Sequence, residues 1–199
     1  MAPTSVAPLR PPSGTRGALL DAAYDAAVTG DWASVRMADV ARAAGVSRQT
    51  LYNEFGSKDA LAQAMAMREI ERFIEGTERA LDDAHPDDPI QAVGAAALST
   101  FQRAADNPLL KAALTDSASG LLSFLTTRGE PAFAAASASF ERYYSTHWPD
   151  LSTTSIRLAA ETIVRLTISY LTLPYDGPAE DVAARLSDIA RKLLKEEPA

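Results

Sequence analysis

Residues 37–58, MADVARAAGVSRQTLYNEFGSK, constrain the fold more than any other part of the chain. The first eight residues place apolar side chains at i, i+3, i+4 and i+7, which is one face of a short helix. Gly45 then breaks the pattern, and glycine readily adopts the left-handed backbone that turns a chain sharply. Ser47 suits the N-cap of a second helix over residues 48–55, which Gly56 would end. The stretch therefore predicts two short helices joined by a tight turn.

The second of these helices has a polar outer face. Leu51 and Phe55 lie at i and i+4, so they should face the core. An arginine can bond bidentately to guanine, and a glutamine or asparagine to adenine. A helix-turn-helix places such a second helix in the DNA major groove. The side chains left pointing outward suit that role: Arg48, Gln49, Tyr52 and Asn53.

Other polar groups around this helix suit phosphate oxygens. Ser57 should cap the next helix, which would put the Lys58 ammonium at a positive helix N-terminus. Arg10 and Arg16 can touch the DNA backbone or minor groove, although an inert solvated tail is an equal reading for Arg10. The complete set of predicted DNA-contacting residues is Arg16, Arg36, Ser47, Arg48, Gln49, Thr50, Tyr52, Asn53 and Lys58.

The combination of residues in this region resembles the DNA-binding domain of the TetR family of one-component bacterial regulators. The resemblance covers roughly residues 15 to 62 and rests on Val40-Ala41, Ala44-Gly45-Val46-Ser47, Thr50-Leu51-Tyr52, Phe55, Lys58 and Leu61. It implies a DNA-binding head, a ligand-binding body and a helix that couples them.

One residue departs from the family pattern. Glu54 stands where the family often has histidine. A carboxylate near phosphates is unfavourable unless it points away or accepts from a cytosine amine. This departure puts the contact role of position 54 in doubt.

Charge and composition permit this interpretation and exclude several others. Residues 1–60 carry six basic and six acidic side chains, so the rest of the chain carries the whole net charge of -7. A neutral head and an acidic body would direct DNA to the head. The chain has no cysteine, which excludes disulfides, thiolate catalysis and zinc–thiolate sites. We see no signal peptide and no membrane span, and expect a cytoplasmic protein without a membrane partner.

The chain is expected to be all-α, with an N-terminal three-helix helix-turn-helix DNA-binding domain and a C-terminal helical bundle for ligand binding and dimerisation. We expect a disordered arm over residues 1–13, the DNA-binding domain over 14–60 and the helical effector-binding and dimerisation domain over 61–199. The first helix should span residues 15–29, Trp32 should fill the core of the head, and Ser34 should cap the second helix.

A long helix from Ser57 to about Ala84 would join the two domains, and in the TetR family this helix couples the ligand pocket to the head. Glu75 and Arg79 on it form a favourable i, i+4 pair. Further helices are predicted at about residues 90–105, 109–114, 130–147, 152–173 and 179–195, with a mixed stretch over 116–129.

The family resemblance implies a small-molecule effector inside the body. Aromatic side chains can line an apolar pocket, and the candidates are Phe73, Phe101, Phe124, Phe140, Tyr144 and Tyr170. Such a lining suggests a small hydrophobic effector: a fatty acyl compound, an alkane or a lipophilic drug. Glu161 and Arg165 lie at i and i+4, so they form either a mutual ion pair or a group that orients a ligand's polar head.

The last two helices suggest a homodimer. Helix 152–173 is apolar nearly all round, and helix 179–195 spaces its apolar residues as a seam for another helix. A two-fold four-helix interface would use both, whereas the alternative is that both cap the chain's own core. The predicted interface residues are Ile156, Ile163, Leu171, Val182, Leu186, Ile189 and Leu193.

We therefore expect a ligand-responsive regulator of transcription that represses by binding a palindromic, double-stranded operator as a homodimer and is released by the effector. An activator or an effector-independent regulator of the same fold is the alternative. A helical-bundle enzyme is disfavoured, because His85 and His147 fall at helix ends without an evident partner. We expect no metal and no cofactor. A helical module that does not bind DNA is the third reading.

Overall fold

The computed structural model describes residues 14–30, 32–115, 120–173 and 175–194. Regular structure in these ranges is helical, as expected. The chain forms two compact units, with the boundary between Met65 and Ala66. The functional division predicted after residue 60 stays a prediction. The N-terminal arm predicted over residues 1–13 lies outside the described residues.

The first unit contains α1 (Thr15–Thr29), η1 (Trp32–Ser34), α2 (Met37–Ala43) and α3 (Arg48–Phe55). Leu19 of α1 and Leu51 of α3 have no solvent-exposed surface, and Trp32 is 5% exposed. Trp32 therefore fills the core of this unit, as the sequence predicts. The bounds of α1 and α3 also agree with the predicted bounds.

The turn between α2 and α3 forms as the sequence predicts. Gly45 has φ +71°, in the left-handed region that costs other residues a steric penalty. The Val46 N–H donates to the Ala41 carbonyl over 3.0 Å and closes the corner. Ser47 then caps α3, since its Oγ accepts from the Thr50 N–H over 3.0 Å. These local contacts fix the angle at which α3 leaves the turn.

The cap predicted for α2 is wrong. Ser34 lies in the short 3-10 turn η1, and α2 begins only at Met37. Arg36 occupies the N-cap position without a side-chain cap bond. The physical reason is the burial of Trp32, which curls residues 32–34 into η1 before the helix can start.

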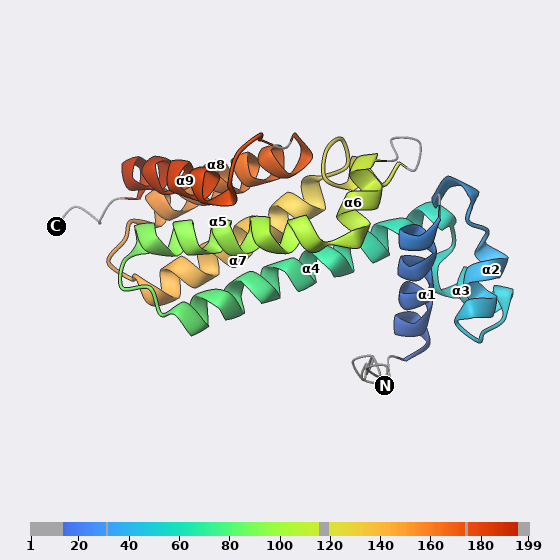
Figure 1. Ribbon diagram of the computed structural model, residues 1–199. Coiled ribbons are helices and arrows are strands. Elements are labelled where there is room, and N and C mark those ends of the chain that lie inside the picture. The colour runs from blue at the N-terminus through green and yellow to red at the C-terminus, as the bar shows by residue number, and fades with distance from the viewer. Residues whose placement is uncertain (1–13, 31, 116–119, 174, 195–199) are drawn as a thin grey trace, which may run out of the picture. The chain divides into compact units, whose positions relative to one another are not determined.

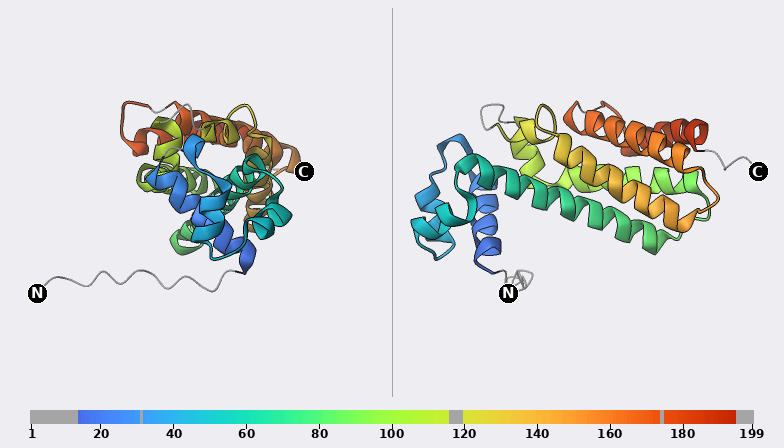
Figure 2. Two further views of the ribbon diagram at one scale, coloured as in Figure 1. Left: turned by 90° about the vertical axis from the view of Figure 1, so that its right-hand side faces the viewer. Right: turned by 180° about the vertical axis from the view of Figure 1, so that it is seen from behind.

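The second unit is a bundle of helices. Helix α4 (Lys58–Ala84) begins in the first unit and continues into the second. The others are α5 (Pro89–Asp106), α6 (Pro108–Thr115), η3 (Leu121–Phe124), α7 (Glu130–His147), α8 (Thr153–Thr172) and α9 (Ala179–Leu193). Within this unit α8 and α9 lie on one side and α4 on the other, with α5 and α7 between them (Figures 1 and 2). None of the helices in the described ranges is long and apolar enough to cross a membrane.

The apolar seam of α9 packs inside the single chain. Val182 is 4% exposed and Leu186 has no exposed surface. Both belong to one core cluster with residues of α5, α7 and α8. The helix against which the apolar face of α9 packs is therefore α5 of the same chain. The alanine-rich surface of α5 allows the two helices to approach closely.

This packing accounts for the burial of several predicted dimer residues, and the dimer interface itself stays a prediction. Ile156 and Ile163 of α8, like Val182 and Leu186, are buried within one chain and present no surface to a partner. Ile189 and Leu193 pack against the same cluster and are half-buried. Leu171 faces a cavity. The buried members of this set, Ile156, Ile163, Val182 and Leu186, contribute to the chain's own core.

Candidate DNA-binding surface and effector cavity

The outer face of α3 carries paired polar side chains. Arg48, Gln49 and Asn53 are exposed, while Tyr52 is half-buried. Gln49 Nε2 donates to Asn53 Oδ1 over 2.8 Å, so the two amides predicted to read adenine are linked. The Arg48 guanidinium lies 5.2 Å from the centre of the Tyr52 ring, and its Nη2 donates to the tyrosine hydroxyl over 3.4 Å. The polar side chains of the outer face therefore contact one another in pairs.

Ser47 and Thr50 form the N-terminal end of this face. Their hydroxyl oxygens are 2.8 Å apart, in addition to the cap bond from the Thr50 N–H. Ser47 thus has a structural role in starting α3. For both residues, contact with phosphate stays a prediction.

The Lys58 side chain is held within the first unit. Its ammonium donates to the Ala33 carbonyl over 2.9 Å and lies 5.3 Å from the centre of the Trp32 ring. The N-cap predicted for α4 at Ser57 forms, because Ser57 Oγ accepts from the Ala60 N–H over 3.1 Å. Lys58 therefore ties η1 to the start of α4, and its phosphate contact stays a prediction. Arg36 is exposed at the start of α2.

Glu54 holds Arg16. Arg16 Nη1 donates to Glu54 Oε1 over 2.8 Å, and the guanidinium lies 4.6 Å from the centre of the Phe55 ring. Sequence reasoning placed Arg16 on the DNA backbone and left position 54 in doubt, without connecting the two. The residues are 38 positions apart, and no local pattern links them.

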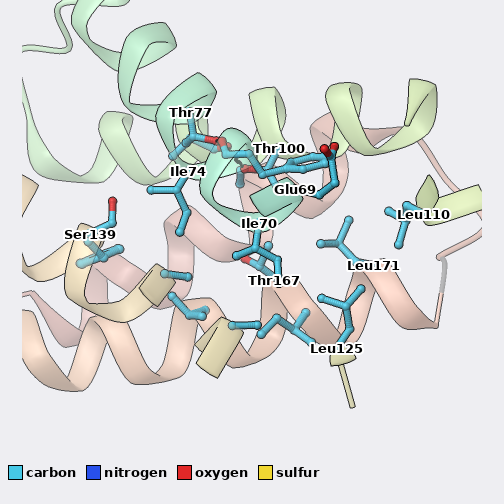
Figure 3. Close-up of a pocket in the computed structure, with 18 of the residues that line it drawn as sticks. Glu69, Ile70, Ile74, Thr77, Thr100, Leu110, Leu125, Ser139, Thr167 and Leu171 are labelled. Atoms are coloured by element: carbon cyan, nitrogen blue, oxygen red, sulfur yellow. Dashed lines mark hydrogen bonds between the residues drawn. The ribbon is translucent and has the colours of Figure 1, made fainter. Parts of the chain in front are cut away.

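An apolar cavity of about 240 Å³ lies within the second unit. Its walls come from α4, α5, α6, η3, α7 and α8, and Figure 3 shows side chains of these elements converging on it. Apolar side chains make up most of the lining, among them Ile70, Phe73, Ile74, Val93, Leu109, Leu121, Leu125, Ile163, Ile168 and Leu171. A cavity of this kind suits a small hydrophobic ligand.

Four of the six predicted effector-binding aromatics line this cavity: Phe73, Phe124, Phe140 and Tyr144. The other two, Phe101 and Tyr170, do not line it. Their rings pack edge to face with centroids 6.2 Å apart, against the core cluster. Whether an aromatic side chain lines the cavity depends on its position around its helix. Residue type alone does not reveal that position.

Several hydroxyl groups of the cavity wall are hydrogen-bonded to the protein. Thr77 Oγ1 donates to the Phe73 carbonyl over 3.0 Å, and Thr100 Oγ1 donates to the Ala96 carbonyl over 2.8 Å. The Tyr144 hydroxyl donates to the Pro89 carbonyl over 2.9 Å. The Thr77 and Thr100 hydroxyl oxygens also lie 3.2 Å apart, and either can donate to the other.

The ionisable side chains of the wall are two glutamates and two tyrosines. Glu69 pairs with Arg72 over 2.5 Å. Glu78 accepts from Ser139 Oγ over 2.6 Å and also pairs with Arg142. No lysine, arginine or histidine belongs to the described lining.

Both tyrosines of the cavity wall, Tyr143 and Tyr144, stay protonated near neutral pH. Burial raises the pKa of Tyr144 well above its ordinary value of about 10. Burial also raises the pKa of Tyr143, with a further contribution from the charge of Asp82 and a hydrogen bond to it. Neither phenol is poised for acid–base chemistry near neutral pH.

The other sequence candidates have structural partners. Glu161 and Arg165 form the predicted ion pair at 3.2 Å, are exposed and lie outside the cavity lining. Arg165 also lies 4.3 Å from the centre of the Phe133 ring. Glu75 and Arg79 pair at 3.7 Å. Within the described ranges, no cluster of three or more histidine, aspartate or glutamate side chains could hold a metal ion.

Comparison with known proteins establishes the family. Residues 19–65 match the model of bacterial regulatory proteins of the tetR family, and residues 88–192 match the model of the C-terminal domain of the bacterial tetracyclin repressor. The chain belongs to the TetR family. TetR proteins are DNA-binding transcriptional regulators and not enzymes, so the expected class, the all-α fold and the absence of enzymatic function are confirmed.

TetR relatives share most of their length with this chain. The HTH-type transcriptional regulator AlkX of Mycobacterium tuberculosis is 37% identical over 173 residues, covering 86% of this chain and 81% of that protein. A second M. tuberculosis HTH-type regulator is 32% identical over 165 residues, covering 83% and 78%.

Among solved structures, the repressor AlkX of Dietzia sp. strain DQ12-45-1b, implicated in biodegradation of n-alkanes, superposes with TM-score 0.73. It is 30% identical and covers 94% of this chain and 99% of its own. RolR bound to resorcinol superposes with TM-score 0.62 at 16% identity over 90% of this chain and 92% of its own, which shows the common fold.

Proposed function

We propose that this TetR-family regulator is a repressor that a small hydrophobic effector releases from its operator. The observation that carries the proposal is the apolar cavity, whose wall includes Ile70, Phe73 and Ile74 of α4. Helix α4 is continuous from Lys58, beside the DNA-binding helix, to Ala84. A ligand that displaces α4 at the cavity can therefore act on the DNA-binding unit through one helix.

Release needs only differential affinity of the effector for two arrangements of the protein. Polar bonds tie α4 to its neighbours around the cavity. Thr77 and Thr100 join α4 to α5 with hydroxyl oxygens 3.2 Å apart, and Glu78 joins α4 to α7 through Ser139. A ligand that strains these bonds would favour an arrangement of the protein in which α4 makes other contacts with α5 and α7. The relative described as a repressor supports this sign of regulation.

The protein is proposed to act as a homodimer. One recognition helix reads few bases, whereas a two-fold dimer reads two half-sites about 34 Å apart along a palindrome. Burial of the α9 seam leaves the outer surface of α8 for a partner, and Leu158 on it is 51% exposed. Sedimentation velocity on the full chain measures this oligomeric state directly.

Operator binding is the first expected result. Genomic fragments selected for binding should yield a palindromic duplex that the protein binds with a Kd of about 10⁻⁸ M or below at physiological salt. Fluorescence anisotropy should show affinity falling steeply with salt, because lysines and arginines displace counterions from phosphates. A scrambled duplex of equal length is the control. Equal, weak binding to both duplexes would contradict the proposal.

An uncharged alkyl ligand should release the operator better than an anion of equal length. The wall contains two carboxylates and, in its described lining, no cation, so a buried carboxylate head would be desolvated without a partner. We expect dodecan-1-ol and methyl dodecanoate to act at concentrations about tenfold below dodecanoate at neutral pH.

The methyl ester is the matched control, since it differs from dodecanoate only in its charge and a methyl group. Release by dodecanoate at the same concentration as the ester would show that the head group lies outside the cavity or meets a cation. Unchanged operator affinity with every apolar ligand would favour an effector-independent regulator.

A further inference from the structure

We propose that Glu54 is a positioning residue that holds Arg16 as a phosphate-binding arm on one flank of the recognition helix. The proposal rests on the DNA-binding function of the first unit and on contact between the outer face of α3 and the major groove. It assigns a role to the one position at which the sequence departs from the family pattern.

Helix geometry places Glu54 on a flank of α3. Leu51 and Phe55 mark its buried direction. At 3.6 residues per turn, Tyr52 and Glu54 lie roughly 80° to either side of that direction. A helix lying in the major groove faces the base edges with its outer side and the two phosphate backbones with its flanks. Tyr52 and Glu54 therefore face opposite strands.

Each flank carries an arginine laid on an aromatic ring. On the Tyr52 flank, Arg48 lies 5.2 Å from the centre of the tyrosine ring. On the Glu54 flank, Arg16 arrives from the first turn of α1 and lies 4.6 Å from the centre of the Phe55 ring. With α3 in the major groove, each guanidinium would lie on the side of one of the two backbones.

The bond to Glu54 orients Arg16 without using up its donors. A guanidinium has five N–H donors in a fixed plane. The contact to Glu54 engages Nη1 at 2.8 Å, and the Arg16 side chain remains 55% exposed. The Phe55 ring supports the guanidinium from one side, and the carboxylate holds Nη1. An arginine held this way loses less conformational freedom when it binds a phosphate.

A competing explanation makes a different prediction. Arg16 could serve only to neutralise Glu54, whose side chain is 35% exposed and would otherwise repel phosphate. In that case a neutral residue at position 54 makes Arg16 dispensable. If Arg16 instead binds phosphate, its removal weakens DNA binding even when position 54 carries no charge.

The test compares wild type, Glu54→Gln, Glu54→Ala and the double variant Arg16→Gln with Glu54→Gln. Glutamine at 54 keeps an acceptor for Arg16 but no charge, whereas alanine removes both. Glutamine at 16 keeps side-chain bulk over Phe55, so the fold is preserved, which thermal unfolding by circular dichroism verifies. Affinity and its salt dependence are measured on the selected operator and on a scrambled duplex. Tight binding of wild type to the operator establishes the function independently of this proposal.

We expect the double variant to bind both duplexes about tenfold more weakly than Glu54→Gln. The slope of log affinity against log salt should be smaller by about 1.8, because a dimer loses one phosphate contact from each of its two Arg16 side chains. Glu54→Ala should bind about threefold more weakly than Glu54→Gln, because its arginine is no longer oriented. A double variant equal to Glu54→Gln in affinity and slope would show that Arg16 only neutralises the carboxylate. Equal binding by Glu54→Ala and Glu54→Gln would show that Glu54 does not position Arg16. Either result overturns the proposal.

Discussion

Phenylalanine in place of Ala136 is expected to weaken the response to effector strongly while operator binding is retained. Ala136 on α7 lines the cavity, and a benzyl group there would occupy a large share of its roughly 240 Å³. A ligand that needs this space would have to displace a packed aromatic ring, which costs about 1–3 kcal/mol or more. We expect the effector concentration for half-release to rise about a hundredfold.

Fluorescence anisotropy with the selected operator and dodecan-1-ol measures this change. Ala134→Phe is the matched control, because Ala134 lies on the same helix with its side chain exposed. It should behave as wild type in both operator binding and release. An Ala136→Phe variant that is still released at the wild-type concentration would place the effector outside this cavity.

Alanine at position 144 is expected to lower the free energy of unfolding by about 3–5 kcal/mol. Tyr144 is 2% exposed and stacks on Phe140 with ring centroids 4.1 Å apart. It belongs to the core cluster and also to the cavity wall. Truncation would enlarge the existing cavity, so the surrounding side chains cannot close over the gap. Urea unfolding at neutral pH, analysed for its midpoint and slope, gives the change.

Tyr144→Phe separates the ring from its hydroxyl. It keeps the stacking and leaves the Pro89 carbonyl without its 2.9 Å donor, so it should cost only about 1 kcal/mol. If Tyr144→Ala lowered the free energy of unfolding by less than about 1 kcal/mol, the ring would not have a central place in the core.

Tyr144 also gives stability a dependence on alkaline pH. Because burial raises the pKa of Tyr144, the phenol ionises in the unfolded chain at a lower pH than in the folded chain. Its contribution is therefore complete below pH of about 10 and is lost as pH rises towards the folded pKa. Tyr144→Phe should remove this part of the loss.

Local interactions explain what could be predicted from sequence. The turn at Gly45 and the cap at Ser47 depend on neighbouring residues, so the bounds of α3 follow from the sequence. The bounds of α7, Glu130–His147, also agree, since Gly129 precedes it and Trp148-Pro149 follows it. The Ser34 prediction failed because burial of Trp32, a tertiary effect, set the start of α2.

The spacing of α9 shows where periodicity stops being informative. Val182 and Leu186 correctly indicated that α9 packs against another helix. The same spacing describes a helix of a second chain or one of the same chain, because an apolar stripe records only the need for burial. Tertiary packing assigned the stripe to α5, which leaves the outer surface of α8 for the proposed dimer.

The sequence by itself determined the helix-turn-helix, the all-helical class and the family, because these depend on residue types at fixed short spacings. Only the tertiary structure decided which aromatics border the cavity, since Phe101 and Tyr170 turn away from it while Phe73 and Phe124 do not. It likewise decided that Glu54 meets Arg16. The physical reason is the same in both cases: side chains distant in sequence meet only after helices have packed, and the rotation of each helix about its axis then selects which side chains share a space.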